Sequence, residues 1–255
     1  MLARMAEARR KCGRVIPMDN QAPSDRSGGR STGSPSKKRS GTRRVPLRDY
    51  SLGEEITNAI THGIGAALAI AALVILIVKS VSDGAGVLLF SALVYGIALL
   101  LEYLMSTLYH AIAHRGAKRV FKVLDHCGIY LLIAGTYTPY CLVTLSEVGG
   151  YWLGAVVWAV ALAGIAFEAF WTFRPRWVSA VVYVVLGWCV VVFIPQLYAA
   201  LDPVGFWLLA AGGASYTVGA VFYVLKKIPY MHSVFHVFVL AGSILQFFSV
   251  LLFVL

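Results

Sequence analysis

The sequence predicts an all-α integral membrane protein with seven transmembrane helices, its N-terminus in the cytoplasm and its C-terminus outside. Three observations lead to this prediction. The chain contains seven apolar stretches of membrane-spanning length. Only 13% of its residues are charged, whereas soluble domains carry about 25%. Finally, Lys and Arg are distributed unequally between alternate loops, which indicates the orientation of the spans.

Each apolar stretch has about 19 to 25 residues, the length that a helix needs to cross a hydrocarbon core of about 30 Å. Backbone groups in lipid must hydrogen-bond within the protein, so helices are the expected spanning form. The alternating polar and apolar pattern of a membrane β-barrel is absent from the sequence. The stretches are Ile60–Val78, Val87–Tyr109, Cys127–Leu145, Tyr151–Phe173, Trp177–Leu201, Pro203–Leu225 and Val234–Leu255.

A basic tail precedes the first stretch. Residues 1–50 hold 13 of the 22 Lys and Arg residues, so most of the net charge of +10 belongs to this tail. The tail has too few apolar residues to pack a core, so residues 1–45 are predicted to be disordered, and the seven-helix domain covers 46–255. It also lacks the apolar segment of a secretory signal peptide. It either contacts anionic lipid or stays solvated and helps to set topology. No nucleic-acid-binding motif accompanies the charge.

The remaining basic residues define the orientation. Loops two, four and six contain eight Lys and Arg residues, and the other loops contain Lys79 alone. The positive-inside rule therefore places the even-numbered loops and the N-terminus in the cytoplasm. The four cysteines are isolated, without CxxC spacing, and are expected to be ordinary residues of the tail and the helices. The eight basic residues are Arg115, Lys118, Arg119, Lys122, Arg174, Arg176, Lys226 and Lys227.

This topology brings polar residues from four helices to one membrane level near the cytoplasmic face. Lys and Arg alone determined the orientation, so the convergence of these other polar residues is an independent observation. The first, third and seventh helices begin on the cytoplasmic side and the second ends there, so their polar residues share a depth. These residues are Glu55, Asn58 and His62, then Ser106 and His110, then Asp125, then His232 and His236.

The histidines suggest a zinc site. His232 and His236 are four residues apart, which places both imidazoles on one face of a helix. A third histidine would complete three protein ligands and leave the fourth position of a tetrahedral zinc open, as in catalytic sites. The sequence HSVFH has no acidic residue after the first histidine, so a base must come from another helix. An HxxxH pair alone is a weak signal, and the convergence of several helix ends strengthens it.

Other polar residues near this level have alternative roles. Asp125 could be a fourth ligand, a base, or the ion-pair partner of Lys122. His62 could hydrogen-bond a neighbouring helix instead of joining the site. Glu102 shares a helix face with Ser106 and His110 and could line the same cavity, although Ser106 could bond to its own helix. His114 and His126 are expected at the membrane surface as solvated side chains, and Glu168 has no evident partner.

Four segments resemble the bacterial hemolysin III family: EEITNAITHGIGA, STLYHAIAH, DHCGIYLLIAGTYTPY and HSVFHVF, in this order. That family is part of the progestin and adipoQ receptor (PAQR) group, which is related to alkaline ceramidases. Any one of these segments is a weak signal, whereas the ordered set is specific. The resemblance covers about residues 46–255 and leaves the tail outside.

The resemblance implies zinc bound by His110, His232 and His236, Asp125 in contact with water on the zinc, and Ser106 beside the site. It leaves the roles of Glu55 and His62 open. Two functions follow from it. One is a zinc-dependent hydrolase of a lipid amide such as ceramide, in the bacterial inner membrane. The other is a haemolytic, pore-forming protein, or a sensor of membrane state with a structural zinc. Membrane lipid is the expected substrate or ligand, and the oligomeric state is not predicted.

Overall fold

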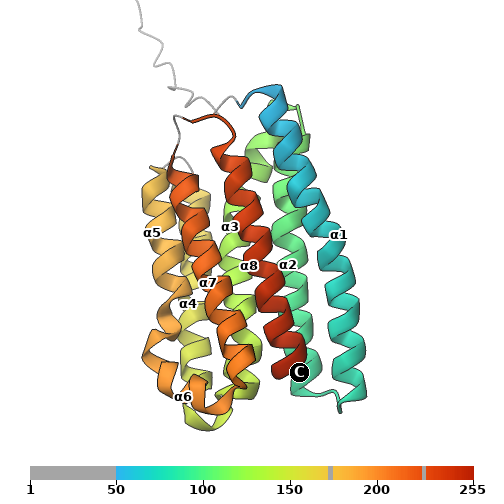
Figure 1. Ribbon diagram of the computed structural model, residues 1–255. Helices are drawn as coiled ribbons and strands as arrows, with labels where there is room; N and C mark the ends of the chain where they lie inside the picture. The colour runs from blue at the N-terminus through green and yellow to red at the C-terminus, as the bar shows by residue number, and fades with distance from the viewer. Residues whose placement is uncertain (1–49, 172–174, 226–227) are drawn as a thin grey trace, which may run out of the picture. The chain divides into compact units, whose positions relative to one another are not determined.

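The computed structural model describes residues 50–171, 175–225 and 228–255, which form a bundle of helices and contain no strand (Figure 1). The chain runs alternately up and down through the bundle, with short connections between successive helices. The α-helices are α1 (Leu52–Ser82), α2 (Val87–Ala111), α3 (Arg115–Pro139), α4 (Gly150–Trp171), α5 (Arg176–Gly187), α6 (Ile194–Ala200), α7 (Pro203–Val224) and α8 (Met231–Phe253).

Seven helical segments in the described part of the chain are long and apolar enough to cross a membrane. The prediction of an all-α, seven-span membrane protein is therefore confirmed. The predicted tail (1–45) lies outside the described residues, as do Phe173, Arg174, Lys226 and Lys227.

The fifth span departs from the prediction of one continuous helix over Trp177–Leu201. Helix α5 ends at Gly187, a 3₁₀ segment covers Cys189–Phe193, and α6 continues to Ala200. Pro195 explains the break, because proline has no N–H and its ring would clash with a carbonyl one turn earlier in a continuous helix. It stands near the start of α6, where both restrictions are tolerated.

Helix α1 begins eight residues earlier than the first predicted apolar stretch. The side chain of Ser51 accepts a hydrogen bond from the Glu54 N–H, and the Glu54 carboxylate accepts one from the Ser51 N–H. This capping box satisfies two of the donors that a helix start leaves unpaired. It makes Glu55 and Asn58 part of the first two turns of α1 and so fixes where they project.

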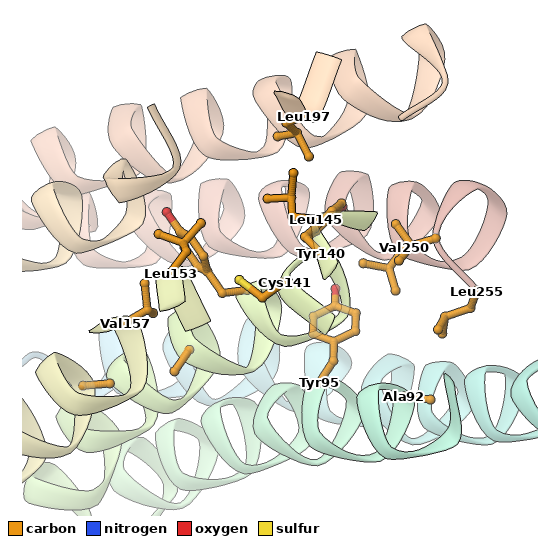
Figure 2. Packing of buried hydrophobic residues seen from close by; sticks show 14 of the residues in the cluster. Ala92, Tyr95, Tyr140, Cys141, Leu145, Leu153, Val157, Leu197, Val250 and Leu255 are labelled. Atoms are coloured by element: carbon orange, nitrogen blue, oxygen red, sulfur yellow. The ribbon is translucent and has the colours of Figure 1, made fainter. Parts of the chain in front are cut away.

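The two ends of the bundle differ in character. We call the end where α1 begins, α2 ends and α3 begins the basic end, because Arg115, Lys118 and Arg119 lie there, and the opposite end the far end. The far half is filled by apolar side chains (Figure 2). They come from the first turns of α2 and α4, from the last turns of α3 and α8, and from α6. Polar side chains are concentrated in the basic half.

Small residues allow helices α2 and α3 to approach closely. A Cβ atom added to Gly135 on α3 would lie 2.5 Å from the Ala98 Cβ and 3.3 Å from the Val94 carbonyl oxygen on α2. Without a strong hydrophobic force between helices in lipid, close packing of this kind supplies much of their attraction. The contact sets the spacing of the two helices that carry His110 and Asp125.

We expect Gly135→Ala to destabilise the protein because neither the Ala98 Cβ nor the Val94 carbonyl can move independently of its helix. Overpacking of this kind costs about 1–3 kcal/mol. The matched control is Gly187→Ala, since a Cβ at Gly187 meets no atom within 4 Å. Thermal unfolding in detergent should show a lower Tm for the first variant than for the second, and equal Tm values would contradict the packing argument.

Candidate metal centre

Three imidazoles meet inside the basic half of the bundle. His110 comes from the last turn of α2, and His232 and His236 come from the first two turns of α8. Each offers one ring nitrogen, and these three nitrogens all lie within 4.8 Å of one another, so the group could hold a metal ion. All three side chains are buried. The predicted convergence of these histidines is therefore present in the fold.

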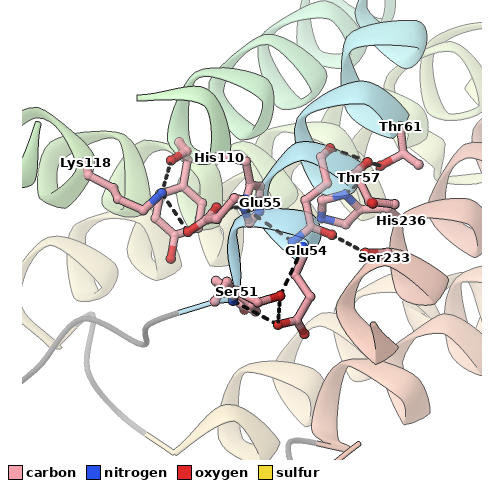
Figure 3. Close-up of polar contacts among 12 residues, drawn as sticks. Ser51, Glu54, Glu55, Thr57, Thr61, His110, Lys118, Ser233 and His236 are labelled. Carbon is pink, nitrogen blue, oxygen red and sulfur yellow. Dashed lines mark hydrogen bonds and ion pairs between the residues drawn. The ribbon is translucent and has the colours of Figure 1, made fainter. Parts of the chain in front are cut away.

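A hydrogen-bonded carboxylate orients His110. Its Nδ1 lies 2.8 Å from Glu55 Oε2, and the Lys118 ammonium lies 2.8 Å from the other Glu55 oxygen (Figure 3). A carboxylate can only accept, so Nδ1 carries the proton and Nε2 presents its lone pair. That Nε2 is buried and has no hydrogen-bond partner among the described residues. The pattern is that of a metal-ligating histidine with an outer carboxylate.

Helix α1 orients His236 through two successive residues. The Thr61 hydroxyl lies 3.1 Å from His236 Nδ1, and its own proton points to backbone carbonyl oxygens of the preceding turn. Nδ1 is therefore the donor and Nε2 is left as the ligand atom. The His62 ring stacks on the His236 ring with centroids 3.5 Å apart and planes at 21°.

Asn58 joins the two helices that flank the centre. Its amide nitrogen lies 3.5 Å from His110 Nδ1, and its carbonyl oxygen accepts a 2.5 Å hydrogen bond from Ser233. Ser233 lies between the two histidines of α8, so this contact helps to set the rotation of that helix. Asn58 thus has a structural contact on each side of the metal centre.

Ser106 and Asp125 lie at one level. Helices α2 and α3 are antiparallel, and a Cβ at Gly128 on α3 would meet the Glu102 carboxylate on α2. One turn from this contact towards the basic end brings the chain to Ser106 on α2 and to Asp125 on α3. Both side chains are buried, and Ser106 Oγ has no hydrogen-bond partner among the described residues.

His62 lies at the same level on α1. The contact of Asn58 with His110 and the close approach of Gly65 to Tyr103 fix the register of α1 against α2. Midway between these contacts, His62 stands opposite Ser106. It is 1% exposed, and neither ring nitrogen has a hydrogen-bond partner within the described ranges. Its ring contacts are with Tyr103 and His236, so the alternative of a hydrogen bond to a neighbouring helix is not seen there.

Three polar residues that the sequence left uncertain lie outside this centre. His114 accepts a hydrogen bond from the Ala117 N–H and so caps α3. His126 is not a solvated surface residue, because its Nδ1 lies 2.7 Å from the carboxylate of the fully buried Glu168. This pair connects α3 with α4 and gives Glu168 the partner that no spacing pattern in the sequence revealed.

Four residues around the centre were missed as site residues by sequence reasoning: Tyr50, Thr61, Lys118 and Ser233. Ser233 could have been found, since it stands inside HSVFH, one residue after the first histidine. Thr61 lies between the predicted Asn58 and His62. Tyr50 and Lys118 gave no signal, because an aromatic residue before a helix and a basic residue in a loop are common. Their roles depend on which helices pack together.

An apolar cavity lies beside the centre. It is bounded mainly by α3, α5, α7 and α8, and its empty space, counted together with its open side, is about 860 Å³. Tyr223 and Phe235 line it and also contact the His232 ring, so one layer of side chains lies between the cavity and the metal centre. Glu102 contributes a buried carboxylate to its wall. The wall does not include Ser106 or His110, so a cavity shared by all three residues stays a prediction.

The donor set fits a transition-metal ion. Three neutral imidazoles suit zinc, copper, iron or nickel, and two of them have Nδ1 engaged so that Nε2 faces the centre. The buried carboxylate of Asp125, level with Ser106, would offset part of the charge of a divalent ion, whereas Glu55 is already paired with Lys118. Within the described residues the group of convergent ligand atoms comprises the three histidines without Asp125. A fourth coordination position therefore remains for a small molecule.

Comparisons with known proteins cover the residues of this centre. The family described as haemolysin-III related matches residues 50–247, which include every residue of the centre. The chain is 48% identical over 202 residues to "Hemolysin-3" of Bacillus cereus, covering 79% of this chain and 92% of that protein. It is 46% identical over 202 residues to "Hemolysin-3 homolog" of Bacillus subtilis (strain 168), covering 79% and 95% respectively.

We expect purified protein to hold about one metal ion per chain, and the double variant His232→Ala, His236→Ala to hold almost none, because two of three ligands are lost. Elemental analysis after gel filtration measures the ratio. His114→Ala is the matched control, because His114 caps α3 and lies outside the cluster. Equal metal content in the double variant and the wild type would remove these histidines as ligands.

Glu55→Gln should weaken metal binding without abolishing it. The neutral amide lowers the basicity of His110 and loses the ion pair with Lys118, and loss of such an outer partner typically costs about 10–100-fold in metal affinity. Competition with a chelator of known affinity measures this ratio. Glu147→Gln provides the control at the far end of the bundle. An unchanged affinity would show that Glu55 does not act through His110.

Proposed function

The chain belongs to the haemolysin III family, a membership consistent with the wider PAQR grouping, and from that premise we propose that it is a zinc-dependent hydrolase of a membrane lipid amide. One observation carries the proposal. Three convergent imidazoles, two of them oriented by hydrogen bonds, adjoin an apolar cavity large enough for part of an acyl chain. A metal-dependent lipid hydrolase would use the metal ligands and the apolar cavity in one place.

Zinc is the metal that the donor set favours for this chemistry. Three histidines with an open fourth position are the ligand arrangement of several catalytic zinc sites. When bound, zinc supplies Lewis acidity, which makes water a better nucleophile near neutral pH and polarises a carbonyl group. His110, His232 and His236 would hold it, with Glu55 and Thr61 fixing two of the rings.

The remaining polar residues would handle protons and orientation. Asp125, whose buried carboxyl group lies outside the ligand cluster, would accept the proton of the attacking water and pass it to the amine nitrogen as the C–N bond of the amide breaks. The Ser106 hydroxyl, buried at the same level, would donate a hydrogen bond to the carbonyl oxygen of the scissile amide. A general base of this kind typically contributes about 10²–10⁴ in rate.

The cavity supports a lipid as the substrate. Apart from Glu102, its wall is made of aliphatic, aromatic, Thr, Gly and Gln side chains, and it meets the centre at Tyr223 and Phe235. An acyl chain in this space would place its polar linkage beside the histidines. A ceramide-like amide fits this division into an apolar tail and a polar head. Substrate would then reach the centre from the bilayer.

We place the protein in the bacterial inner membrane with the basic end in the cytoplasm. The two Bacillus relatives and the concentration of Lys and Arg at the basic end support this arrangement. The zinc centre would then lie near the cytoplasmic face, about two helix turns below the start of α1.

The name of the relatives favours a second candidate, a haemolytic or pore-forming protein in which zinc is structural. A conducting pore needs a continuous polar path, and the far half of the described bundle is packed with apolar side chains. That packing favours hydrolysis over an ordinary ion channel. The other non-enzymatic function with a structural zinc is that of a sensor, which would bind lipid in the cavity without cleaving it.

Purified, zinc-loaded protein incubated with a panel of lipid amides tests the proposal. We expect fatty acid release that is lost on treatment with a chelator and restored by added zinc. Dye leakage from liposomes, measured on the same preparation, tests the pore. Leakage without fatty acid release would overturn the hydrolase and favour the haemolytic function.

Asp125→Asn separates catalysis from structure. We expect it to keep zinc and its Tm while the hydrolysis rate falls by about 100-fold or more, as is typical when a general base is removed. Asp83→Asn is the control, since its partner is the exposed Lys79 at the far end. Loss of zinc together with activity would make Asp125 a ligand, and an unchanged rate would remove it from catalysis.

A further inference from the structure

Tyr50, the residue before the N-cap of α1, lies against two of the three histidines. Its ring stacks with the His232 ring, with centroids 5.3 Å apart and planes at 22°. It meets the His110 ring edge-on at 5.6 Å and 68°. A side chain outside the predicted helix thus contacts ligands from both α2 and α8.

Arg176, the first residue of α5, holds this tyrosine. Its Nη2 donates a 2.5 Å hydrogen bond to the Tyr50 hydroxyl. Its guanidinium group also lies over the Tyr223 ring, 5.1 Å from the centroid, and Nη1 donates to the Tyr223 carbonyl oxygen at 3.4 Å. A planar guanidinium stacks and donates at the same time. Arg176 therefore connects the start of α1 with the end of α7 across the basic end.

The start of α1 is also fixed from the side of α8. The Tyr230 N–H donates to Glu54 Oε1 at 3.0 Å. Glu54 belongs to the capping box with Ser51 (Figure 3). Tyr230 precedes α8 by one residue, so this bond links Glu54, which is itself bonded to Ser51 next to Tyr50, with the turn that carries His232. Two independent attachments, one to α5 and one to α8, thus determine where the Tyr50 ring lies.

We propose that Tyr50 and Arg176 form a clasp, in which Arg176 holds the Tyr50 ring on His232, so that the clasp positions this imidazole and closes the metal centre towards the basic end. Both act as positioning residues, since their contacts are with a ligand and not with the reacting atoms. The clasp rests on the proposed metal centre and is independent of which reaction occurs there. With it closed, the apolar cavity is the route by which a ligand reaches the centre.

The rival interpretation makes Arg176 a receptor for an anionic group of the ligand. Its two terminal nitrogens already donate to Tyr50 and to a backbone carbonyl oxygen, which favours the clasp. The two interpretations predict opposite effects on an anionic chelator. A loosened clasp lets the chelator reach the metal faster, whereas loss of an attractive charge slows it.

The first experiment measures the rate at which zinc passes from loaded protein to an excess of a water-soluble, anionic chelator. We expect Tyr50→Ala and Arg176→Gln each to speed release by about tenfold or more, the factor expected for loss of one charge-assisted hydrogen bond. The zinc-release rate of Tyr50→Phe should be close to that of Arg176→Gln, because both substitutions remove the hydrogen bond between these two side chains. The double variant Tyr50→Phe, Arg176→Gln should release zinc no faster than either single variant, because both substitutions act on one contact.

Arg119→Gln and Tyr151→Ala are the matched controls. Arg119 is an exposed cation at the same end, and Tyr151 is an exposed tyrosine at the far end. Both should release zinc at the wild-type rate, or slightly more slowly for Arg119→Gln. Wild-type rates in the Tyr50 and Arg176 variants would overturn the clasp, and slower release in Arg176→Gln would favour the anion receptor.

The second experiment needs no metal and so separates the clasp from the proposed function. Metal-free protein is treated briefly with diethyl pyrocarbonate, and mass spectrometry measures the modification of His232 relative to the exposed His114. Tyr50→Ala and Arg176→Gln should raise this ratio several-fold over wild type as the ring cover is lost. An unchanged ratio would overturn the clasp, whereas failure of the wild type to bind zinc would overturn the metal centre alone.

Discussion

The contact between Glu55 and His110 is the interaction on which the basic half of the bundle depends. An imidazole buried in a membrane protein is costly unless its N–H has a partner, and the Glu55 carboxylate at 2.8 Å provides one. Lys118 neutralises that carboxylate from the start of α3. The hydrogen bond with His110 and the ion pair with Lys118 meet at the Glu55 carboxylate, so they join α1, α2 and α3 at the basic end of the bundle. They also fix the tautomer of His110, which determines which nitrogen faces the centre.

The chemistry of the bundle is divided by depth. Polar side chains from α1, α2, α3 and α8 meet in the basic half, while Tyr95, Tyr140 and Leu145 belong to the apolar packing of the far half. The cavity lies between these regions, and two of its lining residues, Tyr223 and Phe235, also contact the His232 ring. This division suits a site that acts on the polar linkage of a lipid while its chain stays in an apolar space. The same packing interrupts any polar path across the described bundle.

Other buried polar residues hold the helices around this centre. The His126–Glu168 pair joins α3 to α4, and the Tyr183 hydroxyl donates to the His126 carbonyl oxygen from α5. Sequence reasoning placed His126 at the surface because it could not know that α4 covers that side of α3. It likewise predicted a continuous fifth span, although Pro195 was visible in the sequence, because hydropathy measures apolar content and not backbone continuity. Both errors concern contacts or geometry that hydropathy does not report.

The sequence by itself determined the seven spans, their alternation and the level at which Asn58, Ser106, Asp125 and the three clustered histidines lie. Those results follow from span length and helical rise, which are local properties. Only the tertiary structure decided which residues orient the ligands and which side chain covers them. Thr61 and Tyr50 gain their roles from the helices packed against them, and helix packing depends on side-chain shape at contacts far apart in sequence. Gly65, Gly128 and Gly135 set those distances, and their effect is absent from any pattern along a single helix.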